Sequence, residues 1–347
     1  MLFWGIAFGL LVLPFLRGRT QFVDWDAPDP TRKVALSDDD SDETIVDRVF
    51  SSDVAAFDEE MGLESSLAEH IASASERFFA WDSEHLADSG LVRIDRLENG
   101  RRDFDLQCAG CHGLGGNGSG PAARYLNPRP RNFRKGLYKF VTSAAGARPR
   151  RDDLYRTITK GLAGSSMPGF WMLPEGRRWS IVEYVAWMAM KGEFEQSMLD
   201  WAWTDEELPD PEDVYEIVAK NWGDKATQEV YPTLAEPAND AASIARGGEL
   251  FLSESGASCL SCHGSDGKGG GPAAEGMTDG WGYPIAPRDL TTGIFRSGGS
   301  SKALWMAIGN GIGGSGMPAY SGAISGEDIW HLVHFIQSLS HGDANAR

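Results

Sequence analysis

All four cysteines of the chain lie in two Cys-X-X-Cys-His pentads, residues 108–112 and 259–263. The thiols of such a pentad can bond one porphyrin covalently, and the adjacent imidazole can then ligate its iron. A chance match or a pair of disulfides does not account for two complete copies with no cysteine left over. A zinc site would need both pairs around one metal ion. The sequence therefore predicts two covalently attached haem c groups, held by Cys108, Cys111, His112, Cys259, Cys262 and His263.

The pentads belong to an internal repeat. Residues 108–123 and 259–274 share the pentad, the glycine after it, two further glycines and a closing Gly-Pro-Ala-Ala. Each copy continues with a Pro-Arg pair and a Met-Pro pair in a glycine-rich context, which are Pro130-Arg131, Pro287-Arg288, Met167-Pro168 and Met317-Pro318. Self-similarity of this kind predicts two copies of one domain.

Each copy resembles a class I c-type cytochrome domain, over residues 92–195 and 241–341. The resemblance implies an all-α fold of two small helical bundles around covalent haem, in which a helix before the pentad crosses a C-terminal helix. A crossing contact between glycine and aromatic side chains is implied for Gly100, Phe104 and Tyr184, and for Gly248, Phe251 and Phe335. The glycine-rich loops also resemble a phosphate cradle, but no strand pattern precedes them.

The remaining segments have other compositions. Residues 1–19 combine an uncharged stretch with Arg17 and Arg19, and no basic region or small-residue cleavage site marks a signal peptide. We expect an uncleaved membrane anchor there, with a signal-like segment as the alternative. Residues 20–91 form an acidic linker whose second half has helical periodicity, either an arm for a partner or a helix that covers the first domain. Residues 196–240 form a proline-rich linker, and residues 342–347 a tail.

The second axial ligand decides whether each iron carries electrons or binds substrate. Met167 and Met317 follow their pentad histidines by 55 and 54 residues. A methionine thioether favours ferrous iron and raises its potential, and His/Met ligation is predicted for both haems. Met172 is the close rival in the first copy.

The family resemblance also implies a proline carbonyl as the acceptor for each proximal imidazole, which corresponds to Pro130 and Pro287. Arg131 and Arg288 follow these prolines and are predicted either to pair with haem propionates or to face solvent. Trp171 and Trp179 could line a haem pocket or pack the core.

The net charge of −18 argues against a nucleic-acid partner. Two domains behind an anchor resemble the di-haem cytochrome subunits of respiratory complexes, which implies electron transfer rather than catalysis. The expected partners are a membrane respiratory complex and a basic soluble cytochrome. The anchor would lie in a bacterial inner membrane, with the haem domains on the periplasmic side. The alternative is a di-haem enzyme, such as a peroxidase or a thiosulfate-oxidising cytochrome.

Overall fold

The computed structural model describes residues 67–341, apart from 206–207, 225, 231, 233 and 255. Helices make up its regular structure. In the described residues there is no strand, only the isolated bridges Ser143–Glu229 and Thr278–Pro284. The prediction of an all-α fold is therefore confirmed.

The predicted anchor, residues 1–19, lies outside the described residues, as do residues 20–66 of the linker and the tail, residues 342–347. Within the described part of the chain, no helix is both long and apolar enough to cross a membrane.

The described residues form two compact units. Unit 1 comprises residues 67–126, 130–135 and 183–219, and unit 2 comprises residues 127–129, 136–182 and 220–341. The division follows packing and cuts through the first copy of the repeat. The domain boundaries at 92–195 and 241–341 therefore stay a prediction.

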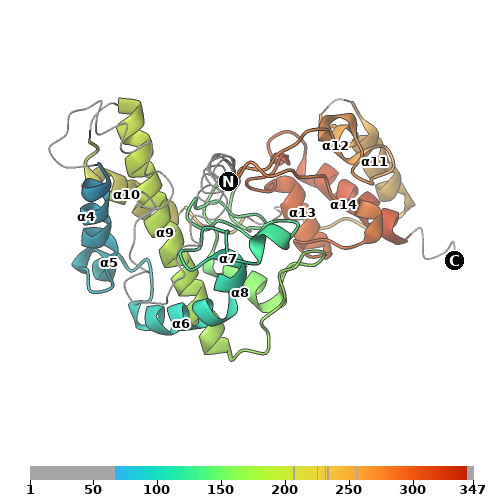
Figure 1. Cartoon of the computed structure of the whole chain (residues 1–347). Helices are drawn as coiled ribbons and strands as arrows, with labels where there is room; N and C mark the ends of the chain where they lie inside the picture. The colour runs from blue at the N-terminus through green and yellow to red at the C-terminus, as the bar shows by residue number, and fades with distance from the viewer. Residues whose placement is uncertain are drawn as a thin grey trace, which may run out of the picture. The chain divides into compact units, whose positions relative to one another are not determined.

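Unit 1 contains four helices and the greater part of a fifth (Figure 1), which are α4 (Leu67–Phe79), α5 (Glu84–Ser89), α6 (Leu97–Gln107), α7 (Ala109–His112) and α9 (Glu175–Asp205). Most of α10 (Pro211–Trp222) also belongs to it. The periodic stretch before the first pentad becomes α4, which packs inside this unit. Phe78 stacks on Tyr215 of α10 with ring centroids 4.6 Å apart, and Phe79 lies 5.4 Å from Phe194 of α9. Helix α4 thus packs against α9 and α10 within unit 1.

The helix before the first pentad makes the predicted aromatic contact. Phe104 of α6 is fully buried and meets Tyr184 of α9 edge-on, with centroids 5.5 Å apart. Phe133, in the loop after the pentad, lies 6.2 Å from the same ring of Phe104. These rings hold the pentad segment against α9.

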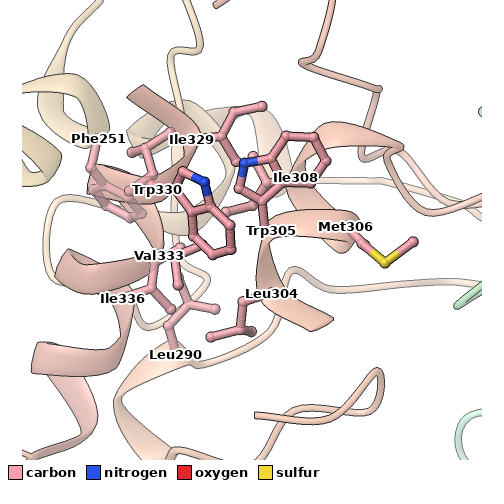
Figure 2. Packing of buried hydrophobic residues seen from close by; sticks show 11 residues of the cluster. Phe251, Leu290, Leu304, Trp305, Met306, Ile308, Ile329, Trp330, Val333 and Ile336 are labelled. Carbon is pink, nitrogen blue, oxygen red and sulfur yellow. The ribbon is translucent and has the colours of Figure 1, made fainter. Parts of the chain in front are cut away.

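Unit 2 contains α8 (Arg151–Lys160), α11 (Ala241–Leu252), α12 (Leu260–His263), α13 (Ser301–Gly309) and α14 (Gly326–His341). Helix α11 packs along α14, and α13 packs against α14 on another side (Figure 1). Their apolar faces form one core, in which Phe251, Trp305, Trp330 and Val333 come together (Figure 2). Phe251 and Phe335 meet with centroids 5.2 Å apart, as predicted.

The predicted contact between Gly248 and the Phe335 ring is present, because a Cβ at Gly248 would stand 3.2 Å from that ring. The adjacent Gly247 approaches α14 more closely. Gly247 faces the backbone of α14, and its Cβ would stand 2.6 Å from the carbonyl carbon of His331. The spacing of four residues between Gly100 and Phe104 recurs between Gly247 and Phe251, so the sequence contained this signal.

Candidate haem sites

Each pentad forms a short helical turn that presents its two thiols together. The amide of His112 donates to the Cys108 carbonyl at 2.9 Å, and that of His263 donates to the Cys259 carbonyl at 2.9 Å. In a helical turn, residues three apart lie on the same face. The two cysteines of each pentad therefore share a face. No disulfide joins any of the four cysteines.

The glycine-rich loop after each pentad folds back onto it in the same way. Gly118 donates to the carbonyl of His112, and Gly269 to that of His263, both at 2.8 Å. The backbone of Gly118 has a φ of +79°, and that of Gly269 has a φ of +89°. Such conformations favour glycine, and a Cβ at Gly118 would also stand 2.7 Å from the Pro130 carbonyl oxygen. Glycine is therefore needed where the loop closes over the histidine.

Both pentad imidazoles are oriented for metal ligation. Nδ1 of His112 donates to the Arg131 carbonyl at 3.0 Å, and Nδ1 of His263 donates to the Arg288 carbonyl at 3.2 Å. A carbonyl can only accept, so Nδ1 bears the hydrogen and the Nε2 lone pair is left for a metal. Burial lowers the pKa of His112 to about 4 and also lowers the pKa of His263. Both rings are therefore neutral at pH 7, the form that ligates iron.

The prediction that Pro130 and Pro287 supply these acceptors is wrong by one residue. The acceptors are the carbonyls of Arg131 and Arg288. The two proline carbonyls lie instead against Gly118 and Gly269 of the folded-back loops. The backbone conformation of the loop after each pentad decides which carbonyl faces the imidazole ring. The order of residues in the sequence does not reveal that conformation.

The second copy encloses an apolar cavity of about 180 Å³. Cys259, Cys262, His263 and Met317 all line it, together with apolar residues that include Phe251, Leu290, Phe295, Leu304 and Ile308. A porphyrin needs apolar walls, two thiols at one edge and an imidazole beneath the ring. The residues present therefore fit a covalently attached haem.

The two predicted methionines sit in loops of identical backbone pattern. Met167 accepts from the amide of Leu162, and Met317 from that of Ile312, both at 3.1 Å. A serine two residues earlier closes each loop, since Ser165 and Ser315 accept from the methionine amides at 3.3 and 3.2 Å. The repeat is thus a structural repeat as well as a sequence repeat.

Met172, the alternative axial ligand of the first copy, and Trp171 both lie largely in solvent. The side chain of Met172 is 74% exposed and that of Trp171 is 66% exposed. Trp179 stacks on Tyr155 with ring centroids 4.3 Å apart. His112 belongs to unit 1 and Met167 to unit 2, so their pairing at one iron stays a prediction from the repeat.

Two arginines stand at the edge of the second cavity. Arg288 was predicted as a propionate partner, and Arg296 was not singled out from the sequence. Nε of Arg288 donates to the Ile294 carbonyl at 2.9 Å, while Nε of Arg296 is buried with no hydrogen-bond partner. In the described residues neither guanidinium is paired with a carboxylate. A bound group with anionic substituents at this edge would give these guanidinium groups a partner of opposite charge.

Two protein families match the chain. The family described as cytochrome c matches residues 244–340, and the family described as cytochrome c oxidase, cbb3-type, subunit III matches residues 95–185. No curated protein matches it. Among solved structures, a chain of the reducing HAO-like protein complex Kustc0457/Kustc0458 from Kuenenia stuttgartiensis is 30% identical, with a TM-score of 0.57. That match covers 70% of this chain and 96% of the other.

The folds and pentads define a protein with tandem haem-binding regions of cytochrome type. The chain belongs to the c-type cytochromes. Membership implies covalently bound c-type haem and haem-based electron transfer.

Proposed function

We propose that the protein is a membrane-anchored di-haem cytochrome that passes single electrons between redox partners. The observation that carries the proposal is the second cavity, where two thiols, a neutral imidazole and a thioether line one apolar space. The first copy repeats the same backbone pattern around His112 and around Met167. Two haems per chain follow from the two copies.

Each part of the site has a distinct task. The paired thiols fix the group covalently, and the Arg131 and Arg288 carbonyls orient the imidazoles and keep Nε2 deprotonated. When bound, haem supplies an iron that alternates between the ferric and ferrous states. A thioether from Met167 or Met317 would help the imidazole to hold the iron and would exclude substrate from it.

The proposed setting is a bacterial inner membrane, with residues 1–19 as the anchor and the haem regions on the periplasmic side. The solved relative belongs to a protein complex, which supports redox proteins as partners here. We propose a membrane respiratory complex and a basic soluble cytochrome. The excess of acidic residues would steer a basic partner and make association fall with salt.

Axial ligation can be tested on the full-length haem-loaded protein. Met167→Leu and Met317→Leu should each convert one haem to a form that binds cyanide, because leucine cannot ligate iron. Met172→Leu is the matched control, since its side chain is exposed, and it should leave both haems six-coordinate. A high-spin iron that binds cyanide or peroxide at either haem of the wild type would contradict electron transfer and would favour a peroxidase-like enzyme.

The setting needs a separate experiment. Native membranes are extracted with high salt and then with mild detergent, and the detergent fraction is purified and its subunits identified. The proposal expects the haem protein only in the detergent fraction, together with other redox subunits. Release by high salt alone would refute the anchor.

A further inference from the structure

A second chamber, of about 390 Å³, adjoins the second haem cavity. Both copies of the repeat contribute to it within unit 2. Its lining residues come from the segments 140–142 and 156–163 and from the segment 295–312, together with Glu229. Its charged side chains are Arg156, Lys160, Arg296, Lys302 and Glu229. Four cations and one anion make this basic chamber unusual in a chain of net charge −18.

Two of these cations already have partners. Arg156 pairs with Asp153 at 3.0 Å and also donates to the Phe140 carbonyl at 2.9 Å. Lys302 pairs with Glu229 at 3.1 Å. Glu229 also accepts from Arg150 at 2.6 Å, so the one carboxylate in the lining is fully engaged.

The other two cations, Lys160 and Arg296, pair with no carboxylate in the residues that the structure describes. Arg296 reaches only the Gly164 carbonyl, at 3.5 Å, and its Nε is buried without a partner. Burial, and the nearby charge of Arg288, lower the pKa of Arg296. A half-buried guanidinium beside another cation is unfavourable unless an anion joins them.

The basic chamber is continuous with the haem cavity. Phe295, Arg296 and Ser297 line both spaces, and so do Phe140, Ala307 and Ile312. A ligand with an apolar body in the cavity could therefore extend anionic groups past Arg296. Haem has this build, with two propionate carboxylates on one edge of an apolar ring.

We propose that the basic chamber binds the propionate carboxylates of the second haem, with Arg296 and Lys160 as their cations. The inference rests on the proposed function, in which the second copy binds haem. Lys160 ends α8 in the first copy of the repeat. The first copy would thus supply positive charge to the haem of the second, and this charge would raise the second midpoint potential by disfavouring ferric iron.

The test is an optical redox titration of the full-length haem-loaded protein. Arg296→Gln and Lys160→Gln should each lower one of the two midpoint potentials, and Lys160→Arg should restore it. Met317→His lowers the potential of the second haem and so identifies its transition. Arg246→Gln is the control, because it removes an equal charge from α11, where Arg246 pairs with Asp328.

A free oxyanion has the same chemistry as a carboxylate, so the wild type and Arg296→Gln are also titrated with phosphate at constant ionic strength. If haem carboxylates occupy the chamber, phosphate leaves both midpoints in place. A saturable phosphate shift in wild type that Arg296→Gln abolishes would assign the chamber to a free anion and overturn the proposal.

The haem content of each variant distinguishes a failure of the basic chamber to bind propionates from a failure of the proposed function. Two haems per chain with midpoints like those of Arg246→Gln would refute the chamber and leave the electron-transfer function intact. Fewer than two covalent haems in wild type would refute the proposed function itself.

Discussion

Gly247 gives the sharpest test of the crossing between α11 and α14. A Cβ at this position would meet the carbonyl oxygen of His331 and would stand 2.6 Å from its carbonyl carbon and 2.7 Å from Cβ of Phe335. Backbone atoms cannot rotate away, so Gly247→Ala must push the helices apart. Overpacking of this kind costs about 1–3 kcal/mol, and backbone contact places this case at the upper end. Alanine regains about 1 kcal/mol of helix propensity, which leaves a net loss of about 2 kcal/mol.

The adjacent glycine is the matched control. A Cβ at Gly248 would meet two ring atoms of Phe335, at 3.2 and 3.3 Å. An aromatic ring at a partly buried position can shift by the few tenths of an ångström required. The gain in helix propensity, about 1 kcal/mol, then offsets or exceeds the packing cost. Gly248→Ala should therefore be as stable as wild type or slightly more stable.

Urea unfolding of the haem-loaded protein, followed by circular dichroism and haem absorbance, separates the two variants. With an m value of about 2 kcal/mol per molar, the midpoint of Gly247→Ala should fall by about 1 M while m stays constant. Gly248→Ala should unfold at or above the wild-type midpoint. Equal midpoints for the two variants, or a higher midpoint for Gly247→Ala, would show that the helices do not meet at this residue.

Four further substitutions, at three sites, test polar groups by the same urea assay. Asp279→Asn should cost about 3 kcal/mol, because it removes the carboxylate that lies 3.2 Å from the ammonium group of Lys139, a side chain that is only 8% exposed; Lys139→Met should cost less. Burial raises the pKa of Asp105, so its carboxyl favours folding only at pH values below its unfolded pKa and loses that contribution as pH rises. Asp105→Asn should therefore be more stable than wild type at pH 7 and equal to it at pH 3, and equal stability at both would refute the burial. Ser243→Ala should cost about 1–3 kcal/mol, because it removes the hydroxyl that Nδ1 of fully buried His334 contacts at 2.6 Å; an unchanged midpoint would contradict that contact.

Much of the second haem site could be predicted from the sequence. The pentad brings its ligand and both thiols together through local geometry alone, since a helical turn aligns residues three apart. The repeat alone was enough to predict that Met317 lies beside the same cavity. Phe251 and Phe335 were likewise predicted to meet and do so.

Other features depended on contacts between distant segments. The acceptor of the pentad imidazole is Arg288 rather than Pro287, because the loop turns back over Gly269 before it reaches the ring. Arg296 carries no motif and becomes notable only because its buried Nε faces a cavity.

The sequence by itself therefore showed the tandem repeat and predicted the chemistry of this protein, namely the haem attachment residues and the proximal histidines, all of which follow from short-range patterns. The tertiary structure decided which carbonyl orients each imidazole, which glycine admits the neighbouring helix, and which cations gather beside the second cavity. These features join residues from different segments of the chain, and Lys160 and Arg296 lie more than a hundred positions apart. Composition and residue spacing do not predict such proximity, because it arises only when the whole unit packs together.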